Sequence, residues 1–459
     1  MAIYIGGTGG AGGGKRTCRF VVGTSTAGWT TKDCDYLCDG VSDEIEFNAA
    51  IKAMPLYGGE IVVLDGTYNI TAAITVDKSY ITLMGNGNNT VLKRMFGSDY
   101  YAGVIIVSEN HCVVRDFQIH GNKQSYGVSY NAGISSNYNT IIQNNWIHDC
   151  AGDGVVSAGS SYQRVIGNRI VNCGMHGITQ SGTDSFVNGN FINGCGDYGI
   201  NITSSFERAI VSNNTVQSCQ NAGIYFSGWE SIVINNVCQD NIGDGIYGSG
   251  VTMAVISSNV CYKNKAKTAA YSSGNGISFK GNNSYVTIIG NTCRQNGTTS
   301  SVNGNGSGIF LGGNSAYITV SGNTCADHAS TSSTNVSGIY AYGLSGSTIN
   351  GNNCYNNMNG ITLEASKSTT ISGNSCFSST EKGIYVVGNT FGCTITGNTV
   401  MRGNGITNSY TATQYTIYMG NIAGSSTQGR GNVVVGNCIL GKNYTDAGES
   451  NTFANNKYS

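Results

Sequence analysis

The amino-acid sequence predicts an all-β fold, a right-handed parallel β-helix solenoid with a short N-terminal capping helix. Three observations carry this prediction. One repeat runs through most of the 459 residues, apolar residues within it alternate with a period of two, and glycine supplies 67 residues against a single proline. Stacked coils of short strands need several tight turns each, which accounts for the glycine. A single solenoid is therefore favoured over several globular domains.

Two markers recur in step through the repeat, mostly 21 to 24 residues apart. The first is a glycine followed by Ile or Val, and the second is an asparagine followed two residues later by Ile, Val or Cys. The marker glycines are Gly133, Gly154, Gly177, Gly199, Gly223, Gly245, Gly276, Gly308, Gly338, Gly360, Gly383 and Gly405. The marker asparagines are Asn145, Asn168, Asn190, Asn214, Asn236, Asn259, Asn291, Asn323, Asn352, Asn374 and Asn398. Gly, Asn or Ser precedes many of these asparagines, which predicts a turn with positive φ between two strands.

Stacked coils place equivalent side chains above one another, so we expect the asparagines to form an amide ladder. Two cysteine columns follow the same register. One column replaces Ile or Val of earlier coils, which predicts buried, reduced thiols: Cys238, Cys261, Cys293, Cys325, Cys354 and Cys376. The other contains Cys150, Cys173, Cys195 and Cys219. No cysteine pair has metal-site spacing, so we expect neither a metal nor another cofactor.

Composition argues against several classes of partner. The formal net charge is −1 with no basic run, so nucleic acid is not an expected partner. No stretch of eighteen apolar residues occurs, so membrane insertion is not expected. The first fourteen residues lack the features of a signal peptide, although a mature chain whose leader was removed would look the same. We expect a virion or extracellular location.

The expected order along the chain has four parts. Residues 1–32 form a flexible, Gly-rich N-terminal attachment segment, and residues 33–132 contain the capping helix and the first irregular coils. The regular β-helix spans 133–440, and 441–459 form a C-terminal cap. We expect Ser42 to cap the short helix, with acidic residues in its first turn. That helix would cover the open end of the solenoid.

The segments from Asp39 to Ile51 and from Gly58 to Tyr68 read as a helix followed by a strand. Together with the repeats behind them, over about residues 33–440, they resemble the pectate-lyase-like β-helix superfamily, especially bacteriophage tailspike proteins. This resemblance implies a lyase, glycoside hydrolase or epimerase acting on acidic or bacterial surface glycans. It also implies a homotrimer, attached to a phage tail through the N-terminus. The Gly-His-Gly and Arg-x-Lys motifs of polygalacturonases do not occur, and we transfer no catalytic residue from the family.

Acidic residues are scarce in the repeats, so those that gather in the coils around residues 145–247 are candidates for catalysis. Repeat alignment places Asp153 beside His176, where a carboxylate can polarise the imidazole for acid or base work. Glycoside hydrolysis needs two carboxyl groups, which Asp149 or Asp153 could provide with Asp197. The candidate catalytic residues are Asp149, Asp153, His176, Asp197 and Asp244. The alternative is that these acids bond backbone amides in turns.

Outward aromatic columns offer flat apolar faces for sugar rings, or equally a contact for a neighbouring subunit. Stacked insertions after residues 265, 297 and 329 could border a binding face, or they are neutral variation in length. The candidate carbohydrate-binding residues are Trp146, Arg169, Phe191, Tyr225, Trp229, Glu230 and Tyr247.

Three functions fit these observations. The first is a phage tailspike or fibre-like protein that binds a bacterial surface polysaccharide, and the residues leave open whether it also depolymerises it. The second is a secreted polysaccharide lyase or epimerase. The third is a non-enzymatic structural or adhesive rod.

Overall fold

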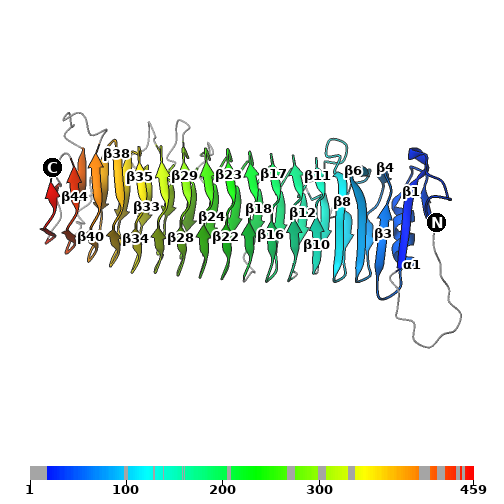
Figure 1. Ribbon diagram of the computed structural model, residues 1–459, viewed down its shortest axis with the longest axis horizontal. Helices are drawn as coiled ribbons and strands as arrows, with labels where there is room; N and C mark the ends of the chain where they lie inside the picture. Colours follow the sequence, from blue (N-terminus) through cyan, green and yellow to red (C-terminus); the bar gives the residue numbers. More distant parts are fainter. Residues whose placement is uncertain are drawn as a thin grey trace. The chain divides into compact units, whose positions relative to one another are not determined.

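The structure is a computed structural model, and it describes residues 18–97, 102–127, 130–137, 139–157, 159, 161–203, 208–265, 274–297, 306–328, 336–402, 414–420, 430–440, 445–446 and 450–458. The chain divides into two compact units, Met1–Ile210 and Val211–Ser459. In both units the strands belong to two parallel sheets, and successive coils lie side by side in chain order (Figure 1). The expected right-handed parallel β-helix is confirmed.

The first unit contains the capping helix and the first coils. Its elements are β1 (Cys18–Thr24), the 3-10 helix η1 (Ser25–Ala27), β2 (Tyr36–Cys38), α1 (Glu44–Ala53), β3 (Gly59–Val63), β4 (Gly66–Ile70), β5 (Ile74–Val76), β6 (Ile81–Arg94), β7 (Gly103–Val107), β8 (Cys112–His120), β9 (Ala132–Ser136), β10 (Thr140–Gln143), β11 (Trp146–His148), β12 (Val155–Ser157), β13 (Arg164–Ile166), β14 (Arg169–Val171), β15 (Ile178–Gln180), β16 (Phe186–Asn188), β17 (Phe191–Asn193) and β18 (Ile200–Ile202).

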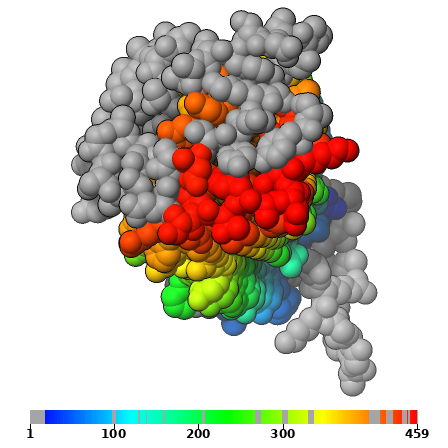
Figure 2. All heavy atoms as spheres, turned by 90° about the vertical axis from the view of Figure 1, so that its left-hand side faces the viewer, coloured from blue at the N-terminus to red at the C-terminus, as the bar shows by residue number. Residues whose placement is uncertain are grey.

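The second unit repeats a coil of three short strands, and Figure 2 views it from the side of its last strands, shown in red. Its elements are β19 (Ile210–Ser212), which begins at the boundary, β20 (Thr215–Gln217), β21 (Ile224–Phe226), β22 (Ile232–Ile234), β23 (Val237–Gln239), β24 (Ile246–Ser249), β25 (Val255–Ser257), β26 (Val260–Tyr262), β27 (Ile277–Lys280), β28 (Thr287–Ile289), β29 (Thr292–Arg294), β30 (Ile309–Leu311), β31 (Thr319–Ser321), β32 (Thr324–Ala326), β33 (Ser337–Tyr342), β34 (Thr348–Asn350), β35 (Asn353–Tyr355), β36 (Asn359–Glu364), β37 (Thr370–Ser372), β38 (Ser375–Ser379), β39 (Lys382–Val387), β40 (Thr394–Thr396), β41 (Thr399–Arg402), β42 (Tyr415–Gly420), β43 (Val433–Val435), β44 (Cys438–Leu440), β45 (Thr445–Asp446), β46 (Thr452–Ala454) and β47 (Lys457–Tyr458).

Each regular coil contributes two strands to one sheet and one strand to the other. We call the first the corner sheet, because its two strands meet at the turn before the marker asparagine, and the second the single-strand sheet. In one coil of the first unit, β13 and β14 belong to the corner sheet and β15 to the single-strand sheet. The residue at the corner has positive φ, for example +64° at Gly167 and +62° at Gly322, as the sequence predicted.

The marker asparagines form the expected ladder in both units. In the second unit, Asn291 Nδ2 donates to Asn323 Oδ1 at 2.9 Å, and Asn291 Oδ1 accepts the backbone N–H of Asn259 at 2.9 Å. In the first unit, Asn145 and Asn168 make the same pair of contacts with the next asparagine. Every rung thus satisfies a buried backbone amide as well as its own side chain.

A second polar ladder, five residues after the first, was not predicted. Its members in the second unit are Asn241, Asn264, Asn296, His328 and Asn357. The equivalent position holds buried cysteines in earlier coils, and Cys219 N donates to Asn241 Oδ1. All sixteen cysteines are free thiols, and fourteen are buried.

The marker glycines have a steric cause. A Cβ on Gly308 would lie 2.6 Å from the carbonyl oxygen of Gly338 in the next coil and 2.8 Å from the Cβ of Cys325. In the first unit, a Cβ on Gly154 would likewise lie 2.7 Å from the carbonyl oxygen of Gly177. Stacked coils approach too closely at this point for any side chain.

The N-terminal helix α1 occurs where the sequence predicted it, but Ser42 as its N-cap is wrong. The N-cap position is Asp43, which makes no side-chain cap bond, and Ser42 has φ +53°. The Asp43 carboxylate instead accepts the backbone N–H groups of Gly40 and Asn69, and the bond to Asn69 ties the start of the helix to β4. The first strand β1 already pairs with β3, so coil structure starts before residue 33. The insertions after residues 265, 297 and 329 lie outside the described residues, as do residues 441–444, 447–449 and 459 of the expected C-terminal cap.

Candidate functional site

A groove of about 440 Å³ lies on the outer face of the single-strand sheet in the first unit. Its floor is one column of side chains from five neighbouring strands. In the order β7, β9, β12, β15 and β18, these are Ile106, Ser135, Val156, Thr179 and Asn201. Asp153 and His176, from the turns that lead into β12 and β15, line the same groove. The floor is therefore partly apolar, with ionisable groups along one side.

Asp153 is held firmly in this groove. One carboxylate oxygen accepts the backbone N–H of His176 at 2.9 Å, and the other accepts the Thr179 hydroxyl at 2.6 Å. The side chain is buried, and burial raises the pKa of Asp153 against the lowering effect of nearby His176, while Asp197 raises it further. A carboxyl group with a raised pKa can act as a proton donor near neutral pH.

His176 lies between two carboxylates. Its Nδ1 is 3.8 Å from Oδ2 of Asp197, and its ring stacks on Tyr198 with 5.4 Å between the centroids. The structure therefore brings together three of the five candidate catalytic residues, namely Asp153, His176 and Asp197. Asp153 and His176 line the partly apolar groove, with Asp197 beside the imidazole, and such groups can exchange protons with a bound substrate.

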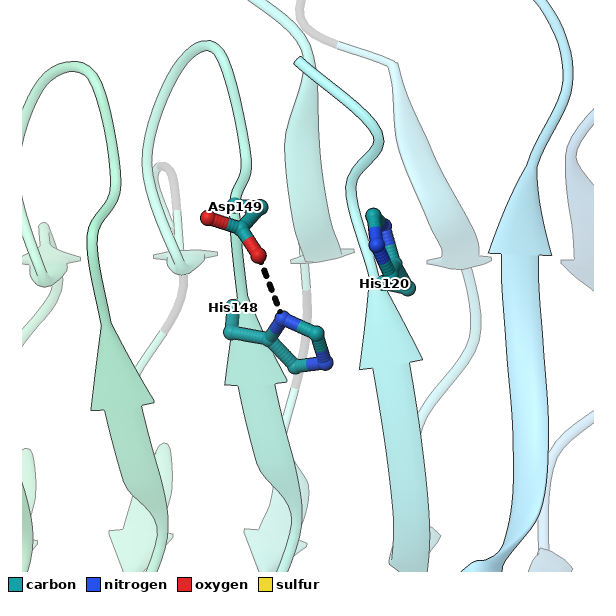
Figure 3. Close-up of side chains that lie close together, drawn as sticks. All are labelled: His120, His148 and Asp149. Atoms are coloured by element: carbon teal, nitrogen blue, oxygen red, sulfur yellow. Dashed lines mark hydrogen bonds and ion pairs between the residues drawn. The ribbon is translucent and has the colours of Figure 1, made fainter. Parts of the chain in front are cut away.

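The other two candidates lie elsewhere. Asp149 does not line the groove. It follows β11, and its carboxylate accepts hydrogen bonds from Nδ1 of His148 at 2.7 Å, as Figure 3 shows, and from the side-chain amide of Asn172. Burial raises the pKa of Asp149, but these hydrogen bonds outweigh it and leave the pKa below its usual value. Asp244 belongs to the second unit, where its buried carboxylate accepts the backbone N–H of Asn275 at 2.7 Å. That contact is the turn-bonding role considered as the alternative.

The candidate sugar-binding column of the first unit consists of Trp146, Arg169 and Phe191. They are register neighbours on β11, β14 and β17. The Arg169 guanidinium carbon lies 5.0 Å from the Trp146 ring centroid, and Arg169 is exposed. This column is on the corner sheet, whereas the groove is on the single-strand sheet.

The remaining candidates lie in the second unit. Tyr225 and Tyr247 are neighbours on β21 and β24, with ring centroids 5.3 Å apart, and Lys280 Nζ lies 5.3 Å from the Tyr247 centroid. Trp229 is 55% exposed in the turn between β21 and β22, and Glu230 beside it has φ +55°. These side chains form an aromatic face and an adjacent exposed indole.

Two groups of metal-ligating side chains meet within the described residues, although no metal was expected from the sequence. One consists of Cys38, Asp43 and Glu46 near the helix, and the other of His120, His148 and Asp149 (Figure 3). Sequence reasoning missed His120, because β8 lies before the regular repeat and its register could not be aligned. No helix in the described part of the chain is long and apolar enough to cross a membrane.

The stacked parallel coils define the chain as a β-helix solenoid protein. The family "right handed beta helix region" matches the chain in overlapping segments, residues 44–192, 79–238, 198–325, 230–400 and 275–458. The chain belongs to this family.

Two solved structures show the same fold. The bacteriophage phi29 gene product 12, in its pre-mature form, has a TM-score of 0.55 at 14% identity, over 88% of this chain and 61% of that one. The Dettilon tailspike protein has a TM-score of 0.50 at 16% identity, over 76% of this chain and 66% of that one. The chain thus spans less than two thirds of either protein. No curated protein sequence matches it.

Proposed function

We propose that this chain is a tailspike-like β-helix protein that binds a bacterial surface polysaccharide in the groove of the first unit and cleaves it there. The observation that carries the proposal is Asp153, a buried carboxyl group with a raised pKa that faces the groove beside His176 and near Asp197. Its fold similarity to a phage tailspike protein supports the phage setting. A virion or extracellular location, a homotrimer and attachment through the N-terminal segment are parts of the same proposal.

The groove suits a sugar chain on physical grounds. Val156 and Ile106 offer apolar contact to ring faces, while Thr179 and Asn201 offer hydroxyl and amide groups to sugar hydroxyls. Strands in neighbouring coils lie about 4.8 Å apart, so five coils span about 20 Å, which is several sugar residues long. Polysaccharide recognition needs such an elongated and mixed surface.

The proposed chemistry uses two carboxyl groups. Asp153, whose pKa burial raises, donates a proton to the leaving glycosidic oxygen, and Asp197 acts as the carboxylate partner. Two coils separate their backbones by about 10 Å, and both side chains approach His176, so their carboxyl groups fall in the range used by glycosidases. The His176 side chain lies close enough to both carboxyl groups to interact with their charges.

The outer aromatic residues would extend the contact with the polymer. Trp146, Arg169 and Phe191 in the first unit, and Tyr225, Tyr247, Trp229 and Glu230 in the second, are the proposed contacts outside the groove. Aromatic rings stack on sugar faces, and Arg169 can pair with a carboxylate or sulfate of an acidic glycan.

The test is an assay of the whole chain against a panel of bacterial capsular and surface polysaccharides. New reducing ends would reveal hydrolysis, and ultraviolet absorbance of unsaturated uronate would reveal a lyase. We expect Asp153→Asn and Asp197→Asn each to lower the rate at least a hundredfold. Asp184→Asn, which breaks an ion pair with Arg208 away from the groove, serves as the matched control and should keep full activity.

If both carboxyl variants process the polymer at the normal rate, the proposed catalytic region is wrong. Binding without any cleavage would favour the non-enzymatic adhesive rod. One observation supports that second candidate: the carboxylate of Asp153 bonds a backbone amide of the next coil, as the carboxylate of Asp244 does. Exchange of the uronate C5 proton without chain cleavage would favour an epimerase.

A further inference from the structure

The cluster of His120, His148 and Asp149 follows from strand register. β8 and β11 are adjacent parallel strands, and their last residues, His120 and His148, are register partners. Their rings lie 4.7 Å apart between centroids. Asp149, which follows β11 with φ +53°, turns its carboxylate back onto His148, as Figure 3 shows.

The hydrogen bonds fix where the protons lie. Nδ1 of His148 donates to the Asp149 carboxylate at 2.7 Å, so Nε2 carries a lone pair, which at present accepts the Gln118 amide at 3.0 Å. Nδ1 of His120 accepts the backbone N–H of Asn122 at 2.9 Å, so this nitrogen also carries a lone pair. Both rings therefore hold a basic nitrogen whose only partner is an N–H group, and a cation can replace that partner.

We propose that His120 and His148 bind a divalent first-row transition metal such as Zn²⁺ or Ni²⁺, with Asp149 holding Nδ1 of His148 so that its Nε2 faces the metal. One ligand atom from each residue lies within 4.8 Å of the other two. Metal–nitrogen bonds of about 2.0–2.1 Å bring ligand atoms to roughly 3.4 Å from one another, so the side chains must approach each other by at most about 1.4 Å. Imidazole nitrogen selects these metals over Ca²⁺ and Mg²⁺, which prefer oxygen.

The surroundings favour the metal. A carboxylate that holds Nδ1 of a histidine is the usual partner of a metal-binding imidazole, because it orients the ring and makes it more basic. Burial lowers the pKa of His120, and the charge that His148 could carry acts in the same direction. Two imidazole ligands leave coordination positions open for water or another donor.

The neighbouring indole gives a direct readout. The Trp146 ring stacks on His148 with 4.6 Å between the centroids, and the chain has only two other tryptophans. Ni²⁺ bound at His148 should therefore quench Trp146 fluorescence. Calorimetry of the metal-free full chain with ZnCl₂ or NiCl₂ gives the stoichiometry, which we expect to be one metal per chain.

Substitutions assign the site. His148→Val places at position 148 the residue type that stands at its register partner Val171, so the strand should tolerate it. We expect His148→Val and His120→Gln each to weaken binding at least tenfold, and Asp149→Asn to weaken it ten- to hundredfold. His111→Gln, at an exposed histidine of the same unit, is the matched control and should bind normally.

Two outcomes overturn the proposal: absence of saturable binding by the folded full chain, or binding that survives both histidine substitutions. Trp146→Phe should abolish the quenching while calorimetric binding persists, and quenching that persists in this variant would place the metal elsewhere. Circular dichroism and a melting curve for each variant confirm that it is folded. No polysaccharide enters these measurements, so their result is independent of the proposed function.

Discussion

The substitution Asn291→Ala probes the interior ladder of the second unit at one rung. Asn291 Oδ1 accepts the backbone N–H of Asn259 at 2.9 Å and its Nδ2 at 3.0 Å. Asn291 Nδ2 donates to the Ile256 carbonyl and to Asn323 Oδ1, both at 2.9 Å. Alanine at this position removes all four contacts and offers no polar group in return.

The expected loss follows from the groups left without partners. The backbone N–H of Asn259 and the carbonyl of Ile256 are buried, and each buried group that loses its hydrogen bond costs about 1–3 kcal/mol. Together with the weakened amide contacts, we expect a loss of about 3–5 kcal/mol in the free energy of unfolding. Thr292→Ala, on the outer face of the same coil, should cost only about 0.5 kcal/mol.

Urea denaturation followed by circular dichroism measures the two free energies. Because coils of a solenoid can unfold separately, hydrogen exchange at the Asn259 amide gives a local measure as well. A loss of about 3 kcal/mol corresponds to roughly a hundredfold faster exchange. The reasoning fails if Asn291→Ala costs no more than Thr292→Ala, or if exchange at Asn259 is unchanged.

Three further results are expected. Burial lowers the pKa of His328 in the folded protein. The stability that neutral His328 contributes is therefore full above the unfolded pKa of about 6.5 and is lost as the pH falls below it. His328→Asn should make unfolding less sensitive to acid, as urea titrations at pH 5 and pH 8 would show. Gly308→Ala should destabilise the protein far more than Gly322→Ala. A Cβ at Gly322 would meet no atom within 4 Å, so that substitution costs only about 1–2 kcal/mol for its positive φ. Equal melting temperatures of the two variants would contradict the steric reason for the marker glycines. If Asp153 is the proton donor, cleavage of polysaccharide should fall as the pH rises through its raised pKa, and a rate that rises there instead would exclude this role.

The sequence was sufficient to predict the coils because the same physical constraint repeats in each of them. The position of Asn291 holds an asparagine in every regular coil, because its side-chain amide bonds the next coil. The position of Gly308 holds a glycine because a Cβ there would clash with the carbonyl oxygen of Gly338. Such constraints leave a period that can be counted. The second ladder escaped notice because its members change type, from Cys219 to Asn241 and later to His328.

The candidate site was predictable only in part. Asp153 and His176 stand at the same position of consecutive coils, so their proximity followed from alignment. The cluster around His148 did not follow, because His120 ends the nine-residue strand β8, which lies outside the regular period. The distance between Asp149 and the groove depends on the path of one turn, which no repeat specifies.

The position of a bound oligosaccharide tests the proposed function most directly. Crystals of the full chain, with Asp153→Asn to prevent turnover, would be soaked with fragments of a polysaccharide that the chain binds. We expect sugar density along the single-strand sheet of the first unit, over Val156 and Thr179, with a glycosidic oxygen near residue 153. Well-ordered sugar on another face, with this groove occupied only by water, would contradict the proposal.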